Sequence, residues 1–253
     1  MFIFHLVFVV YLSIVNFQLE NLMLFVVFSY TKQYTLYMIA FSYKRLIDQI
    51  LLPLFGGSLF FLLLLTPLIY YSFAPSFHAE YMAHKWLVMS DSSFGHVQNV
   101  YMFIQGRSFL DQDFSLAEKS HMEDVKWLFG LAYFIEIIAV VVFLSVLLVF
   151  VFQRKMRLIV TWLFRGSLIS LILFFLLFAF LFIDFAATFN LFHALFFPQG
   201  NWSFDSSSML ISLFSASFFE AIATRVFIVG VCISLLVFCC TVMWRKVWTI
   251  QKQ

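Results

Sequence analysis

His121 and Asp124 are of the residue types that proton-transfer chemistry requires. They lie three residues apart in a segment that the sequence predicts to be helical, so their side chains share one face. A carboxylate beside an imidazole can fix its tautomer and raise its basicity, as a general base requires. The alternative interpretation is a solvated helix start that carries ordinary charges.

His193 is the second candidate for this chemistry. It is flanked by Phe192, Phe196 and Phe197, and an interfacial histidine in an aromatic belt is the alternative interpretation. The functional interpretation gains from the pairing with His121, because each histidine lies near the membrane end of its own polar loop. The two side chains are therefore predicted to meet at one membrane surface.

Phe197, Asn201 and Trp202 are predicted to bind substrate beside the histidines. They surround the helix break formed by Pro198 and Gly200. An amide such as Asn201 can donate to an oxyanion, and tryptophan is favoured at the membrane interface. An ordinary turn residue is the alternative for Asn201.

A metal site is the competing chemistry for His121, Asp124 and His193. The sequence has no HExxH motif, and its three cysteines lack metal-binding spacing. We therefore expect no metal and no cofactor, and a metal-dependent membrane hydrolase remains an alternative.

The composition indicates an integral membrane protein. Hydrophobic residues make up 64% of the chain and charged residues 11%, against about 45–50% and 25% in soluble domains. A net charge of +2 gives no indication of nucleic-acid binding. The expected fold is an all-α membrane protein, a four-helix transmembrane bundle with a small extracellular cap that contains some strand around Val97–Ile104.

Four segments are apolar over the roughly 20 residues that a membrane span needs. They are Leu51–Phe73, Trp127–Phe152, Leu158–Ile183 and Val226–Trp244. Residues 1–37 form an apolar extension that is either a fifth span, over Phe2–Leu19, or the product of a misjudged translation start. The four-span domain is expected over residues 38–253, with polar loops at 74–126 and 184–225.

Basic residues set the expected orientation. Lys44-Arg45, the Arg154–Arg157 turn and Arg245-Lys246 fall on one side, which the positive-inside rule makes cytoplasmic. Both polar loops are then external. Within the first loop, Ser115 and Glu118 have the spacing of a capping box, which predicts the start of the helix that carries His121.

The remaining titratable residues are interpreted as structural. His78, His84 and His96 show no pattern with carboxylates and are expected at the surface. Glu136 and Arg165 lie within predicted spans, where charges need partners. We expect them to pair if the second and third spans pack together.

Two motifs together resemble a known family. FSLAEKSHMEDVKWLF (Phe114–Phe129) and FHALFFPQGNWSFD (Phe192–Asp205) resemble the small four-span bacterial membrane proteins that include the lipoprotein intramolecular transacylase, Lit. The resemblance implies movement of the sn-2 acyl chain of a diacylglyceryl lipoprotein onto its N-terminal cysteine amine, which gives a lyso-form lipoprotein. It places His121 and His193 on the two active-site histidines of the family.

The resemblance also implies partners and a location. The partners are diacylglyceryl-modified bacterial lipoproteins and membrane lipid, and we expect a monomer in the bacterial cytoplasmic membrane with its active site at the outer face. We assign His121 as the base and His193 as the donor or leaving-group acid, or the reverse. The family's acidic residue near Ser208 and its Pro-Glu near Ser215-Ala216 are missing here. A bis-histidine haem protein and a non-catalytic membrane partner protein are further alternatives.

Overall fold

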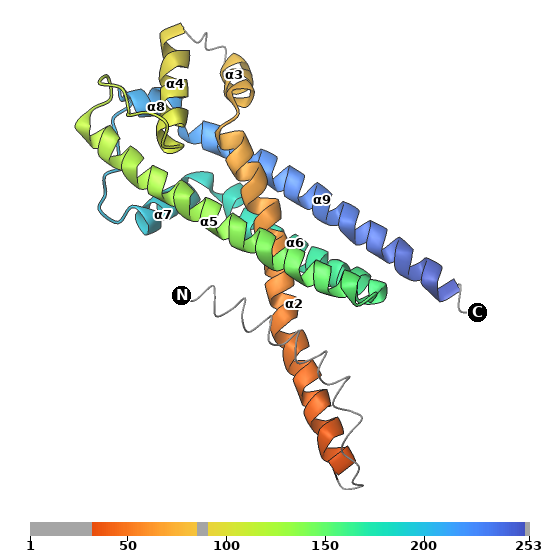
Figure 1. The fold of residues 1–253 in the computed structure, drawn as a ribbon. Helices are drawn as coiled ribbons and strands as arrows, with labels where there is room; N and C mark the ends of the chain where they lie inside the picture. Colours follow the sequence, from red (N-terminus) through yellow and green to blue (C-terminus); the bar gives the residue numbers. More distant parts are fainter. Residues whose placement is uncertain (1–31, 85–90, 251–253) are drawn as a thin grey trace.

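The computed structural model describes residues 32–84 and 91–250, and these ranges are helical apart from short turns (Figure 1). The predicted N-terminal span Phe2–Leu19 lies outside the described residues. The described helices are α2 (Lys32–Ser72), α3 (Pro75–His84), α4 (Asp91–Ile104), α5 (Leu116–Phe152), α6 (Met156–Ile183), α7 (Phe185–Phe196), α8 (Met209–Leu213) and α9 (Ala216–Ile250).

Four of the described helices are long and apolar enough to cross a membrane. The segments are Gln49–Ser72 of α2, Leu116–Phe152, Met156–Ile183 and Ala216–Val247. Each predicted span overlaps one of them, so the prediction of a helical, multi-pass membrane protein is confirmed. The apolar helix α7 is too short to cross.

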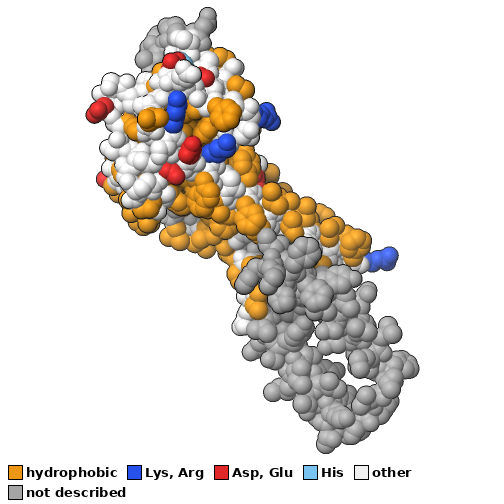
Figure 2. Space-filling view, turned by 60° about the vertical axis from the view of Figure 1, so that its left-hand side comes forward, with side chains coloured by type: hydrophobic (Ala, Val, Ile, Leu, Met, Phe, Trp, Pro, Cys, Tyr) orange, Lys and Arg blue, Asp and Glu red, His pale blue; other side chains and the backbone are white. Residues whose placement is uncertain are grey.

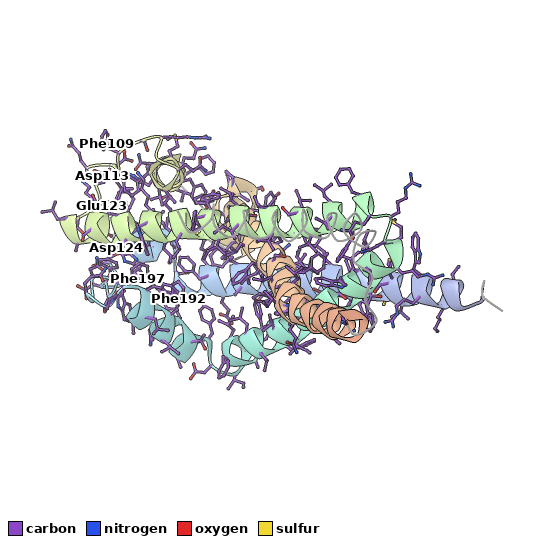
Figure 3. All side chains as sticks on the ribbon, turned by 60° about the horizontal axis from the view of Figure 1, so that its bottom comes forward. Phe109, Asp113, Glu123, Asp124, Phe192 and Phe197 are labelled. Carbon is purple, nitrogen blue, oxygen red and sulfur yellow. The ribbon has the colours of Figure 1, made fainter. Side chains whose placement is uncertain are left out.

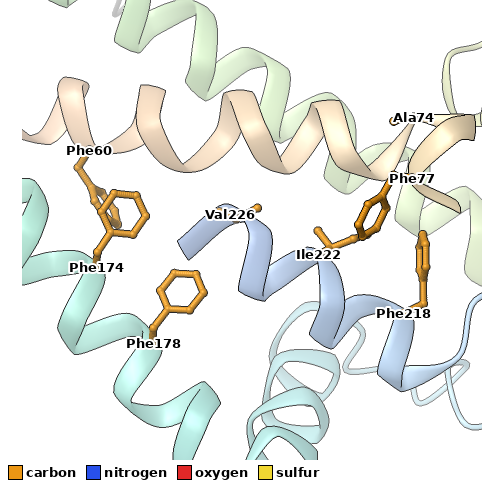
Figure 4. Close-up of a cluster of buried hydrophobic side chains, with 8 residues drawn as sticks. All are labelled: Phe60, Ala74, Phe77, Phe174, Phe178, Phe218, Ile222 and Val226. Atoms are coloured by element: carbon orange, nitrogen blue, oxygen red, sulfur yellow. The ribbon is translucent and has the colours of Figure 1, made fainter. Parts of the chain in front are cut away.

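The bundle is held together by aromatic packing between α2, α6 and α9. Helix α2 packs against α5, α6 and α9, and α6 also runs along α9. In the cluster of Figure 4, Phe60 of α2 meets Phe174 of α6, while Phe178 and Val226 continue the contact between α6 and α9. A Cβ atom at Gly230 would lie only 2.2 Å from the Phe174 ring. Glycine at this position therefore lets the two helices approach closely.

A cap of helices and loops covers one end of the bundle (Figure 1). It consists of α3, α4, α8 and the segments that join them, and we call this end the cap side. Its core is formed by buried residues including Val97, Val100, Phe114, Met122 and Leu210. Most of the charged side chains visible in Figure 2 gather over the cap, whereas hydrophobic side chains cover the bundle below it.

The predicted strand around Val97–Ile104 is wrong, because this segment is the C-terminal half of α4. Val97, Val100, Tyr101 and Phe103 are buried, while Met102 is 43% exposed. A spacing of three and four residues marks one face of a helix. No strand occurs within the described ranges, so the cap is helical as well.

The prediction that His78 lies at the surface is also wrong. Its side chain is 1% exposed and packs against Phe214 and Phe218. Its Nδ1 shares a 3.2 Å hydrogen bond with the Tyr101 hydroxyl. Burial lowers the pKa of His78 to about 4, so the imidazole is neutral where α3 joins the cap to the bundle.

The other histidines of the first loop differ from His78. His96 is half-buried, and its Nδ1 lies 3.4 Å from Asp111 Oδ2. Its Nε2 lies 3.5 Å from Asp113 Oδ2. The side chain of His84 lies outside the described residues.

The expected pair between Glu136 and Arg165 does not form in the described structure. Thr66 Oγ1 of α2 instead donates a 2.6 Å hydrogen bond to Glu136 Oε1 of α5. The physical reason is the arrangement of the helices, since α5 packs far more closely against α2 than against α6. The carboxylate of Glu136 therefore links the first and second spans.

Candidate active site

His121 lies in the second turn of α5, and the start of this helix is strongly held. Ser115 Oγ accepts from Glu118 N at 3.3 Å, and Glu118 Oε2 accepts from Ser115 N at 2.8 Å. The predicted capping box is therefore confirmed. Glu118 Oε1 also accepts from Ser208 Oγ at 2.9 Å and from Leu210 N at 3.0 Å. The helix that presents His121 is thus tied to the start of α8.

His193 lies in the last turn of α7, which begins at the N-cap Asp184 and ends before Pro198. Gly200 follows with a positive φ of 75°, and the chain turns there back toward α5. His193 Nδ1 lies 2.8 Å from the Phe189 carbonyl oxygen. A carbonyl can only accept, so Nδ1 carries the proton and Nε2 keeps its lone pair.

The two imidazoles lie face to face between α5 and α7. The ring centroids of His121 and His193 are 6.2 Å apart with planes inclined by 27°. Phe197 contacts both, at 4.8 Å from His121 and 5.5 Å from His193. Trp202 lies 4.9 Å from His193, and Phe204 lies 5.6 Å from His121. Both histidines are more than nine-tenths buried in this aromatic setting.

Asp124 faces α7 but contacts the loop after it. In Figure 3, Asp124 lies on the side of α5 toward Phe197, and Glu123 lies on the opposite side. Asp124 Oδ2 accepts from Gln199 Nε2 at 2.6 Å and from Asn201 Nδ2 at 2.7 Å. Among the described residues, no hydrogen bond joins Asp124 to His121. The carboxylate therefore fixes the loop directly.

Asn201 lies near both this carboxylate and the ring of His121. Its Oδ1 is buried without a hydrogen-bond partner in the described structure, and so is His121 Nδ1. The Asn201 amide lies within interaction range of the ring. Leaving both atoms unpaired would cost free energy. His121 Nδ1 and Asn201 Oδ1 are therefore complementary polar groups that the described structure leaves unpaired within the site.

The buried setting also determines the charge of His193. Burial lowers the pKa of its imidazole, and the hydrogen bond to the Phe189 carbonyl partly opposes this shift. The ring is therefore mainly neutral near pH 7. A neutral imidazole with a free Nε2 is able to accept a proton.

The structure gathers all six of the predicted site residues at one place. They are His121, Asp124, His193, Phe197, Asn201 and Trp202. Sequence reasoning missed Gln199, Phe204 and Phe189. Phe189 lies one helical turn before His193 and was detectable from that spacing, whereas the contacts of Gln199 and Phe204 depend on how the loop folds back.

This arrangement occurs in a chain that matches a family model. The model of the lipoprotein intramolecular transacylase Lit matches residues 50–219, which is more than half of the chain and includes both histidines. The chain belongs to the Lit family. The family name describes acyl transfer within a lipoprotein, which gives this membrane protein a transacylase class and a lipoprotein-related role.

Solved structures agree with the family assignment at the level of the fold. The membrane-integral lipoprotein intramolecular transacylase Lit from Bacillus cereus is 16% identical, with a TM-score of 0.66 over 81% of this chain and 98% of that chain. A histidine-to-alanine variant of the same Bacillus cereus protein gives a TM-score of 0.68, at 16% identity over 83% and 99%. A histidine-to-arginine variant gives 0.69, at 16% identity over 85% and 99%. Among curated protein sequences, none matches this chain.

Proposed function

We propose that this member of the Lit family moves the sn-2 acyl chain of a diacylglyceryl lipoprotein to the amine of the N-terminal cysteine, giving a lyso-form lipoprotein. The observation that carries the proposal is the facing pair of His121 and His193, buried among aromatic rings at 6.2 Å. The reaction converts an ester and an amine of one molecule into an amide and an alcohol. Two proton-transfer groups at one membrane surface suit this chemistry.

The reaction begins with removal of a proton from the substrate amine. An α-amino group has a pKa of about 8, so it arrives largely as an ammonium. His193 Nε2 takes the first proton, and the neutral nitrogen then attacks the ester carbonyl carbon. His121 Nε2 takes the second N–H proton as the carbon–nitrogen bond forms. No serine nucleophile is required, because amine and ester belong to one substrate and need only be brought into an attack geometry.

The second half of the reaction returns one of these protons. The His193 imidazolium donates a hydrogen bond to the tetrahedral oxyanion, which lowers the energy of this intermediate. The bond between the carbonyl carbon and the glycerol oxygen then breaks, and His193 delivers its proton to that oxygen. His121 releases its proton to solvent. The products are one amide, one alcohol and one proton for each ammonium ester consumed.

Asp124 and Asn201 support His121 in this scheme. The Asp124 carboxylate holds the Asn201 amide at 2.7 Å, and we propose that His121 Nδ1–H donates to Asn201 Oδ1 when the substrate is bound. The positive charge that develops on His121 is then stabilised by a carboxylate two hydrogen bonds away. Because the Asn201 amide already donates to Asp124, we assign oxyanion stabilisation to His193. The rings of Phe197 and Trp202 form the apolar walls for the substrate.

The proposal includes an orientation in the membrane. Arg154 and Lys155 join α5 to α6, and Arg157 lies in the first turn of α6. This turn is at the end of the bundle away from the cap, where the last part of α9 carries Arg245 and Lys246 (Figure 1). The positive-inside rule makes this end cytoplasmic. The active site then lies at the outer face, where diacylglyceryl lipoproteins are anchored. We propose that one chain is sufficient, since α5, α7 and the loop of Asn201 supply every residue of the site.

Mass spectrometry of lipoprotein N-terminal peptides tests the proposed function. Cells with the wild-type protein are expected to yield lyso-form peptides with an acyl amide on the cysteine. His121→Ala and His193→Ala should each reduce this conversion by about 10²–10⁴-fold, with normal accumulation in the membrane. His96→Ala, a histidine of the same cap outside the site, is the control. Wild-type conversion in both active-site variants would rule out the assigned chemistry.

A further inference from the structure

A crevice opens between α6, α7 and α9 on the lipid-facing side of the bundle. It is lined mainly by Phe178, Leu181, Phe182 and Phe185, with Ala223 and Thr224 on the opposite helix. Its cavity volume is about 120 Å³. This value lies below the range of about 300–1,000 Å³ for small-molecule sites, so the crevice has room for part of a ligand and not for a whole one. The proposed reaction scheme uses none of these residues.

The crevice has a polar end and a closed apolar end. Glu220 lies at the end toward the cap, one turn before Thr224 on α9. At the opposite end, the rings of Phe178 and Phe227 are 4.7 Å apart. Beneath them, Phe174 fills the space over Gly230. A lipid in the membrane leaflet on the cap side is arranged in the same way. Its polar head group lies toward the cap, and its acyl chain ends deeper in the membrane.

Phe189 joins the crevice to the active site. Its ring lies 5.7 Å from Phe185 at the mouth of the crevice and 4.1 Å from the His193 ring. From His193 to Phe185 the path along α7 is about 12 Å, and from Phe185 to Phe178 along α6 it is about 10 Å. Half of a bilayer core is roughly 15 Å thick. An acyl chain that extends through this depth therefore passes Phe185 and enters the mouth of the crevice.

Glu220 determines which head groups suit the mouth. Its side chain is exposed, and it has no cationic partner among the described residues. The nearby Arg225 is paired instead with Glu80, at 2.7 Å. An unpaired carboxylate repels an anionic phosphate and attracts an ammonium group. A diacylglyceryl cysteine has no phosphate and carries an α-ammonium.

We propose that this crevice binds one acyl chain of the substrate, and that Glu220 at its mouth disfavours anionic phospholipids. The inference rests on the proposed function, because the diacylglyceryl lipopeptide is the ligand. The chain lies along Phe189, passes Phe185 and points into the crevice toward Phe178. Its ester carbonyl is then held between His121 and His193.

A substitution inside the crevice tests the binding of the chain. Ala223→Phe fills the space between α6 and α9, so the ratio of kcat/KM for a lipopeptide with long acyl chains to one with short chains should fall about 10-fold. Loss of roughly 1.4 kcal/mol of chain burial corresponds to this change. Ile228→Phe adds the same ring at a lipid-exposed position of α9 and should keep the wild-type ratio. An unchanged ratio in Ala223→Phe would overturn the proposal.

Photolabelling of the wild-type protein gives a readout that does not depend on turnover. A lipopeptide with a diazirine at the end of its acyl chain should label peptides that contain Phe178, Phe182 or Ala223. Labelling of other peptides would overturn the proposal that the acyl chain binds in the crevice, whatever the activity of the substituted proteins. If the wild-type protein does not convert the lipopeptide at all, the proposed function fails, and labelling in the crevice would then show lipid binding alone.

Competition during photolabelling tests the role of Glu220. Phosphatidylglycerol should compete with the lipopeptide less effectively than zwitterionic phosphatidylcholine in the wild-type protein. Glu220→Gln removes the charge and should abolish this difference. Glu123→Gln neutralises an exposed carboxylate of α5 outside the crevice and should preserve the difference. Equal competition by the two lipids in the wild-type protein would rule out charge selection by Glu220.

Discussion

Asn201 donates a 2.7 Å hydrogen bond to Asp124, so a carboxylate of α5 fixes the loop that closes the site from α7. Asp124→Asn is expected to reduce the rate of acyl transfer by about 10–100-fold, because a hydrogen bond to a charged group is worth about 1.5–3 kcal/mol. The decrease should appear in kcat, because both histidines remain. Lipopeptide kinetics measure it, and Glu123→Gln on the opposite side of α5 is the control.

A double substitution checks the route through Asn201. If Asp124 acts on His121 through the Asn201 amide, then Asn201→Ala should remove most of the benefit of Asp124. Adding Asp124→Asn to Asn201→Ala should then cause little further loss. Fully additive effects of the two substitutions would contradict this coupling.

The spans and the capping box could be predicted from sequence because both depend on local composition and spacing. Twenty apolar residues are sufficient to identify a span, and Ser115 with Glu118 to identify a helix start. The strand predicted around Val97 was wrong because the segment is short, and the helical spacing of its buried residues appears only once the cap is packed. His78 was misplaced because only the packing of α3 against α9 shows that it is buried.

The hydrogen-bond partner of Asp124 could not be predicted either, because it also depends on the packing of segments that are distant in the sequence. The sequence offered His121 three residues away, whereas the structure brings Asn201 from another loop. The two histidines were located correctly because each lies beside a clear local signal. The helix start marks His121, and the break at Pro198 marks His193.

Glu118 is expected to stabilise the cap. Its buried carboxylate accepts hydrogen bonds from Ser115 N, Ser208 Oγ and Leu210 N. Glu118→Ala leaves a buried N–H unsatisfied, which costs about 1–3 kcal/mol, and the thermal midpoint in detergent should fall. Glu118→Gln keeps one acceptor oxygen, so its thermal midpoint should fall less. Equal midpoints for wild type and Glu118→Ala would refute this role.

His78 should make stability depend on pH. Its pKa is about 4 in the folded protein against an ordinary 6.5, so the unfolded chain binds a proton that the folded chain excludes. Stability is full above pH 6.5 and declines as the pH falls toward 4, by about 3 kcal/mol in all. Thermal midpoints measured across this window test the prediction. His78→Phe should make the profile shallower without flattening it, because burial also lowers the pKa of His193. His96→Phe should leave the contribution of His78 in place.

The contact between Gly230 and Phe174 gives a matched pair of glycine substitutions. A Cβ at Gly230 would meet the Phe174 ring at 2.2 Å, whereas a Cβ at Gly130 meets nothing within 4 Å. Gly230→Ala must therefore push Phe174 out of a fully buried position, and overpacking of this kind costs about 1–3 kcal/mol. Gly130→Ala changes only helix propensity and is expected to be neutral or slightly stabilising. Thermal midpoints in detergent should separate the two variants, and a midpoint for Gly230→Ala equal to that of Gly130→Ala would show that α6 and α9 do not pack this closely.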